Sequence, residues 1–214
     1  MNQPKLYLKQ IEVGMMQNFV YLIGDRQKRE CVIVDPAWEV DRVLREAAGD
    51  EMKVTAALVT HAHFDHVNGL GDFLKKVKGK IHAHRDEAGF LKPWRSEIKP
   101  MGDGDKLTVG DIEITFLHTP GHTPGSQCFL AENKLVSGDT LFIQACGRCD
   151  LPGGNPEQMY YSLKRLASLD DKVVLYPGHN YSDESTSTIS QEKQWNPYLQ
   201  SSNLEDFLAF RMRR

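Results

Sequence analysis

The sequence has few cysteines, no long hydrophobic run and no excess of positive charge. Four cysteines in 214 residues are too few for a disulfide scaffold and are typical of a reducing compartment. No apolar run approaches the roughly 20 residues that a membrane-spanning helix needs, and the first ten residues lack the apolar segment of a signal peptide. These absences predict a cytoplasmic protein with no membrane partner.

The charge balance excludes a further class of protein. The chain carries 26 lysines and arginines against 29 aspartates and glutamates, which gives a formal net charge of −3 at pH 7. A strongly basic nucleic-acid binder is therefore excluded, and no nucleic-acid partner is expected. With 40% hydrophobic and 26% charged residues, the composition is that of an ordinary globular protein, and the length fits one domain over residues 1–214.

Hydrophobic periodicity places two clusters of strands in the chain, with helices around them. Short strands rich in β-branched and aromatic residues are expected within 5–35 and within 106–138. Helices are expected over 38–48, 66–78, 156–167, 183–195 and 203–211, and further strands over 54–60, 80–84 and 172–177. This arrangement predicts an α/β fold with four layers, an αββα sandwich.

The eight histidines are unevenly distributed along the chain. Five of them lie within 24 residues: His61, His63, His66, His82 and His84. His61 and His63 follow the predicted strand 54–60, and residues two apart in extended backbone point to the same side. Asp65 is expected to cap the next helix, which would turn Asp65 and His66 toward the same space. These four residues favour a metal site, because burying them without a cation would desolvate a carboxylate and leave polar groups competing for partners.

Three further segments place a ligand-type residue in a turn after an apolar strand, and they supply His122, Asp139 and His179. The seven candidate ligands, five histidines and two aspartates, exceed what one tetrahedral zinc needs. None is a cysteine, which argues against a closed structural zinc site. Two divalent cations that share a bridging carboxylate would use the whole set, with Asp139 as the bridge.

The candidate ligands lie in four motifs in this order: HAHFDH (61–66), TPGHTPGS (119–126), SGDTLF (137–142) and YPGHNY (176–181). This ordered set resembles the metallo-β-lactamase superfamily over nearly the whole chain. The resemblance implies an αββα sandwich with its metal site at one edge of the two sheets. It implies a first metal held by His61, His63 and His122, a second held by Asp65, His66 and His179, and Asp139 bound to both. The implied cofactors are two divalent metal ions, zinc first, with iron or manganese as alternatives.

Within the superfamily, the segment 139–148 is similar to the glyoxalase II group, which hydrolyses glutathione thioesters. The similarity implies a hydrolase that cleaves a thioester of the hydroxyacylglutathione type, or a related ester, by hydroxide formed from metal-bound water. Arg148 and Tyr181 would contact the thiol part of this small-molecule substrate, and Asp65 would be the catalytic residue that orients the hydroxide. The group's second tyrosine is replaced here by Cys149-Asp150. A lactonase or β-lactamase is less expected, and the enzyme could form a homo-oligomer.

The segments 146–150 and 187–199 are also similar to persulfide dioxygenases of the same fold. Those enzymes hold a single ferrous iron at the positions of His61, His122 and Asp139, with open positions for oxygen. Oxidation of a persulfide therefore stays open as an alternative activity, as does a non-catalytic member that binds a ligand.

The remaining candidates are expected to have structural roles. His82, His84 and His118 are expected to be structural histidines. Asp35 is expected to hydrogen-bond to the metal loop rather than to bind a metal. Cys146 and Cys149 form a C-x-x-C pair without a neighbouring redox pattern, and they are expected to line the entrance of the site.

Overall fold

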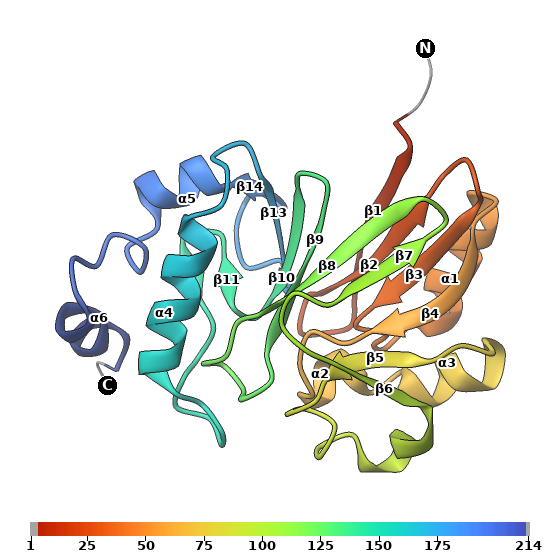
Figure 1. Cartoon of the computed structure of the whole chain (residues 1–214), viewed down its shortest axis with the longest axis horizontal. Coiled ribbons are helices and arrows are strands. Elements are labelled where there is room, and N and C mark those ends of the chain that lie inside the picture. Colours follow the sequence, from red (N-terminus) through yellow and green to blue (C-terminus); the bar gives the residue numbers. More distant parts are fainter. Residues whose placement is uncertain (1–3, 213–214) are drawn as a thin grey trace.

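Two six-stranded sheets form the centre of the fold (Figure 1). The computed structural model describes residues 4–212. The first sheet contains, in spatial order, β1 (Leu6–Val13), β2 (Asn18–Asp25), β3 (Glu30–Val34), β4 (Lys53–Leu58), β5 (Ile81–His84) and β6 (Ile98–Met101). The second contains β14 (Ser187–Thr188), β13 (Val174–Pro177), β10 (Lys134–Gly138), β9 (Gln127–Ala131), β8 (Ile112–His118) and β7 (Lys106–Val109). A separate small hairpin pairs β11 (Leu141–Phe142) with β12 (Ala145–Cys146).

The strand directions bring several carboxyl ends to one region. In the first sheet, β1, β2 and β3 form an antiparallel meander, and β3, β4, β5 and β6 run parallel. In the second sheet β10 and β13 run parallel, and the other pairs are antiparallel. The two sheets are joined near these ends, because the Gln127 amide donates to the Thr60 carbonyl at 2.9 Å and the Phe19 amide donates to the Gly178 carbonyl at 2.8 Å.

Helices cover the outer face of each sheet, as Figure 1 shows. The helices beside the first sheet are α1 (Val40–Gly49), α2 (Phe64–Val67) and α3 (Leu70–Lys76), followed by the 3₁₀ helix Lys92–Glu97. Those beside the second sheet are α4 (Pro156–Ala167), α5 (Ile189–Trp195) and α6 (Leu204–Arg211). The four-layer prediction is therefore confirmed. No helix of the described segment is long and apolar enough to cross a bilayer.

Three hydrophobic clusters fill the spaces between the four layers. Phe116 and Phe129 lie in the cluster between the two sheets, and Phe73 lies in the cluster beneath α1 and α3. The third cluster, beneath α4, α5 and α6, contains Cys146 and Cys149. The expectation that these two cysteines line the site entrance is wrong, because the apolar packing of this layer buries both side chains.

The predicted helix over 66–78 is two helices, α2 and α3, with a break at Asn68 and Gly69. The break has a tertiary cause: the Asn68 side chain accepts a hydrogen bond from the Trp38 amide at 2.6 Å, and a β-carbon on Gly69 would lie 2.7 Å from the Pro36 carbonyl oxygen. The expectation that Asp65 caps the helix is also wrong. His63 is the N-cap residue of α2, and Asp65 lies in its first turn.

The C-terminal helical segment also differs from its prediction. The expected helix 183–195 begins only at Ile189, where the Thr188 side chain accepts from the Gln191 amide as an N-cap. Ser187 and Thr188 form the short edge strand β14, and residues 183–186 lie in neither a helix nor a strand. The hairpin of β11 and β12 and the strand β6 were not predicted, since two to four residues carry too little periodicity.

Candidate metal centre

The seven predicted ligands come together where β4, β8, β10 and β13 end. Two sets of three residues each place their ligand atoms within 4.8 Å of one another: His61, His63 and His122, and Asp65, His66 and His179. Asp139 follows β10 and lies between the two sets. The structure therefore brings together every residue that the sequence proposed as a metal ligand.

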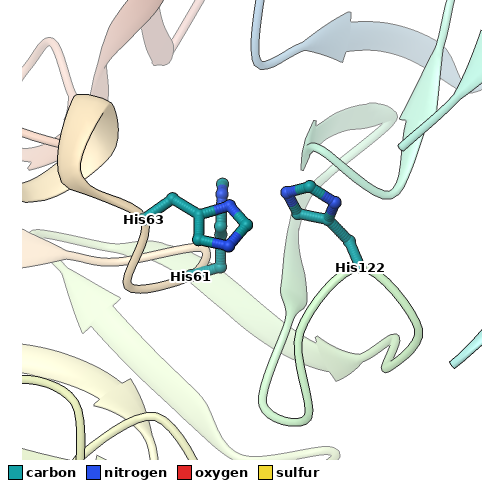
Figure 2. A group of neighbouring side chains, drawn as sticks. All are labelled: His61, His63 and His122. Carbon is teal, nitrogen blue, oxygen red and sulfur yellow. The ribbon is translucent and has the colours of Figure 1, made fainter. Parts of the chain in front are cut away.

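The first set consists of three imidazoles that face one another from two sides (Figure 2). His61 and His63 come from the loop after β4, and their ring centroids are 4.7 Å apart. His122 comes from the turn after β8, with its ring centroid 4.8 Å from that of His61 and 4.5 Å from that of His63. This separation leaves a space between three nitrogen-bearing rings.

Asp139 connects the first set to the second through one carboxylate oxygen. Its Oδ2 atom lies 3.5 Å from His122 Nε2 and 3.4 Å from His179 Nε2. Asp65 Oδ2 lies 3.4 Å from the same His179 nitrogen. These distances exceed those of a good hydrogen bond, and they place Asp139 where a bridging carboxylate would lie. A β-carbon at residue 178 would lie 2.4 Å from Asp139 Oδ1, so Gly178 is needed for this approach.

Hydrogen bonds at Nδ1 orient three of the histidines. His122 Nδ1 donates to the Arg148 carbonyl at 2.7 Å, and His179 Nδ1 donates to the Met16 carbonyl at 2.9 Å. His66 Nδ1 lies 2.9 Å from Asp35 Oδ2. A carbonyl or carboxylate oxygen can only accept, so Nδ1 carries the proton and Nε2 is left to face the cluster.

His61 is held in the same way through a hydroxyl group. The Thr60 hydroxyl donates to Asp35 Oδ2 at 2.6 Å, so its oxygen accepts from His61 Nδ1 at 3.0 Å. The Thr60 amide donates to the other oxygen of Asp35 at 2.7 Å. Through these hydrogen bonds Asp35 supports a ligand of each set, as its predicted role requires. Its φ of 51° is a left-handed conformation that aspartate tolerates better than most residues.

Unpartnered buried nitrogens test whether this cluster fits metal ions. Among residues 4–212, His61 Nε2 and His122 Nε2 are buried and have no hydrogen-bond partner. A buried polar atom without a partner is costly, and a neutral imidazole nitrogen is a preferred ligand of zinc and similar cations. The donor set of five imidazoles and two carboxylates fits borderline divalent cations, so the residues present fit two such ions.

The electrostatics of the cluster keep His61, His63 and Asp139 in the forms that bind cations. His66 differs, because its neighbouring carboxylates outweigh burial and hold its pKa well above its usual range. Burial lowers the pKa of His63 to about 4, with the neighbouring His122 adding to the effect. Burial also holds the pKa of His61 well below its usual range. Burial alone would raise the pKa of Asp139, but His66 and His179 outweigh it and hold that pKa well below its usual range. His61 and His63 are therefore neutral and Asp139 is ionised at neutral pH.

Two residues that the sequence analysis did not single out hold the ligand loops. Asn18, which is buried at the start of β2, donates from Nδ2 to Asp65 Oδ2 at 2.9 Å and accepts from the Trp38 indole at 2.9 Å. Glu87 is 1% exposed, and its two oxygens accept from the amides of Ala62 at 2.7 Å and Gly125 at 2.8 Å. Glu87 therefore ties the loop of His61 and His63 to the turn that carries His122. Neither residue shares a motif with the ligands, so sequence spacing offered no signal.

Of the two predicted substrate contacts, the Tyr181 side chain borders the cluster and the Arg148 side chain points to solvent. Tyr181 stacks on His179 with ring centroids 4.6 Å apart and an interplanar angle of 12°, so it borders the second set. The Arg148 side chain is 63% exposed and forms an ion pair with Asp150 at 2.8 Å. Only its main-chain carbonyl reaches the cluster, through His122.

The other histidines lie outside the two sets. His82 is buried in β5, and burial lowers its pKa to about 4. His84 and His118 stack with ring centroids 3.9 Å apart, and His118 Nε2 donates to the Pro124 carbonyl at 2.9 Å. With Asp86 they form a group whose possible ligand atoms lie within 4.8 Å of one another, but it shares no residue with the two sets. These contacts agree with the structural roles expected for all three.

The comparison with known proteins agrees with this geometry. The metallo-beta-lactamase superfamily matches residues 13–179. The chain is 33% identical to the probable polyketide biosynthesis zinc-dependent hydrolase BaeB of Bacillus velezensis over 94% of this chain and 89% of that protein. It is 32% identical to the mitochondrial persulfide dioxygenase ETHE1 of Bos taurus, over 85% of this chain and 71% of that protein. It is 33% identical to the hydroxyacylglutathione hydrolase of Photobacterium profundum, over 86% of this chain and 69% of that protein.

A solved structure gives the same result for the fold. The crystal structure of ETHE1 from Myxococcus xanthus superposes with a TM-score of 0.88 at 30% identity, and covers 95% of this chain and 89% of that one. The sequence resemblance to both the glyoxalase II group and the persulfide dioxygenases is thus confirmed at the level of family. With the family match spanning most of the residues, including all seven candidate ligands, the chain belongs to the metallo-beta-lactamase superfamily.

Proposed function

We propose that this member of a superfamily of metal-dependent hydrolases binds two divalent metal ions, zinc in the first place, and hydrolyses thioesters. The observation that carries the proposal is the pair of three-residue sets joined by Asp139, with the buried Nε2 atoms of His61 and His122 unpartnered within the described part of the chain. A single tetrahedral ion would leave part of this set unused.

The residues of the cluster divide the work of hydrolysis. Cations held at the two sets would supply Lewis acidity toward the carbonyl oxygen and would lower the pKa of water toward neutrality. Asp65 would accept a hydrogen bond from the attacking water, because Asn18 fixes its carboxylate beside the second set. A thiolate leaves without being protonated, so a thioester suits a site built from imidazoles and carboxylates. Tyr181, stacked on His179, would contact the thiol part of the substrate.

The relatives support hydrolysis and leave the thiol open. BaeB and the hydroxyacylglutathione hydrolase are both named as hydrolases, and the chain spans 89% of the first but 69% of the second. The thiol carrier is therefore proposed only as a small-molecule or carrier-bound thiol, with hydroxyacylglutathione as the first compound to test.

Two variants and one control test the proposal. His61→Ala removes one ligand of the first set, and Asp139→Ala removes the bridge. Both are expected to lose at least one metal ion per chain by elemental analysis, and to lose more than a hundredfold in thioester hydrolysis followed by thiol release. The control His84→Gln changes a histidine outside the two sets. It should keep the parental metal content and the parental rate of thioester hydrolysis. A folded His61→Ala protein with full activity and metal content would refute the proposal.

A second candidate function is persulfide oxidation with one iron ion. It is favoured by the TM-score of 0.88 to ETHE1 and by the presence of two histidines and one carboxylate at His61, His122 and Asp139. Protein purified without added metal separates the two functions. About two zinc ions per chain, with no oxygen uptake on glutathione persulfide, supports the hydrolase. One iron ion with oxygen uptake supports the dioxygenase.

A further inference from the structure

A cavity of about 230 Å³ opens beside the first ligand set. It is lined by Ala62, His63, Glu87, Phe90, Thr123, Pro124 and Pro152. His63 belongs to the first set, and Thr123 directly follows His122 in the chain. One wall of the cavity is therefore formed by the candidate metal centre itself.

The polar groups of the cavity wall are already engaged with the protein. Both carboxylate oxygens of Glu87 accept from backbone amides, and the Thr123 hydroxyl is 2.7 Å from the Ser126 hydroxyl. The remaining wall consists of the Phe90 ring, two prolines and the Ala62 methyl group. Such a wall offers apolar surface and has few groups that could hydrogen-bond to a polar ligand.

The size of the cavity fits one part of a substrate. Whole-ligand sites are usually about 300–1,000 Å³, so this volume suits a fragment that is attached to the reacting group. A second and smaller cavity of about 50 Å³ lies beside the second ligand set, where His179, Phe142 and Tyr181 line it. A thioester with its carbonyl at the cluster could place one end at the His63 cavity and the other at the His179 cavity.

We propose that the cavity at Phe90 binds an apolar acyl chain, and that the protein prefers thioesters of unbranched apolar acids over those of small polar hydroxy acids. This inference rests on the proposed thioesterase function. Phe90 is 63% exposed, and an acyl chain packed against its ring would remove this apolar surface from water. Phe90 is thus the residue whose removal changes chain-length preference most.

Hydrolysis of a series of thioesters with one thiol and acyl chains from acetyl to octanoyl tests the preference. Each added methylene that enters the cavity should raise kcat/KM by about two- to fourfold until the cavity is full. Phe90→Ala should flatten this series, so that the ratio of kcat/KM for the octanoyl compound to kcat/KM for the acetyl compound falls toward one. The control Trp195→Ala removes a similarly exposed aromatic side chain that does not line the cavity, and its series should match the parent.

A binding measurement separates the cavity from catalysis. Calorimetric titration of zinc-loaded protein with straight-chain carboxylates, acetate to octanoate, should show affinity rising with chain length in the parent and less steeply in Phe90→Ala. Active enzyme with kcat/KM and affinity independent of chain length would overturn the acyl site and leave the proposed function intact. Chain-length-dependent affinity in a protein that hydrolyses no thioester would overturn the proposed function and leave the apolar site.

Discussion

Replacing Glu87 by glutamine removes one link between the two loops of the first ligand set. Glu87 accepts one backbone amide with each oxygen, at 2.7 and 2.8 Å, and it is 1% exposed. A glutamine of nearly the same shape has one acceptor oxygen, so its NH₂ group must face either the Ala62 or the Gly125 amide. An unsatisfied buried amide costs about 1–3 kcal/mol, and the bond that remains loses its charge assistance.

We therefore expect Glu87→Gln to lower the free energy of unfolding by about 2 kcal/mol, which for a chain of this length lowers Tm by about 4–8 °C. Because the lost link positions His63 against His122, zinc affinity should fall by about 10- to 100-fold. Calorimetric melting of the metal-free protein and zinc competition with a chromophoric chelator measure the two effects. The control Glu97→Gln breaks an exposed pair with Lys80 at 2.9 Å and should change stability by less than about 1 kcal/mol. A Glu87→Gln protein with parental Tm and zinc affinity would refute the reasoning.

Three further predictions concern the supports of the site and the core. Asp35→Asn should weaken zinc binding by about 10- to 100-fold in chelator competition, because asparagine cannot accept all three hydrogen bonds from Thr60 and His66. The control Asp171→Asn, at an exposed ion pair with Lys193, should leave zinc affinity unchanged. Burial lowers the pKa of His82 from 6.5 to about 4. As the pH falls, the unfolded chain therefore binds a proton at this residue before the folded chain does. The free energy of unfolding should fall between pH 6.5 and pH 4, by at most about 3 kcal/mol. Urea unfolding at pH 7 and pH 4.5 should show this loss in the parent and a smaller one in His82→Phe, and equal losses would contradict it. All four cysteines are buried and burial raises their pKa values, so a thiol reagent should modify none in the native protein and four after denaturation.

The candidate ligands were predictable from sequence because each lies in a short motif directly after a strand. A strand is followed by a tight turn, and ligand-type residues in such turns can be read without knowing how the turns meet. The supporting residues Asn18 and Glu87 carry no such mark. Asn18 is 47 residues from its partner Asp65, and Glu87 is 38 residues from Gly125, so their roles arise only when the sheets pack.

The element boundaries failed where tertiary contacts overrode local pattern. Helical periodicity continues through residues 66–78, yet the chain breaks at Asn68 because its side chain bonds to the Trp38 amide. Asp65 has the residue type of a helix cap, but Asn18 draws its carboxylate toward the cluster instead. In both places one long-range hydrogen bond competes with a local preference of similar size and prevails.

The sequence alone determined the class of fold, through its hydrophobic periodicity, and the set of seven candidate ligands, through the order of its four motifs. Such features depend on residue type and spacing along the chain. Only the tertiary structure decided that Cys146 and Cys149 are core residues, that Arg148 pairs with Asp150, and that an apolar cavity borders His63. These properties depend on which side chains from distant segments are packed together, and packing is a property of the folded chain rather than of any one segment.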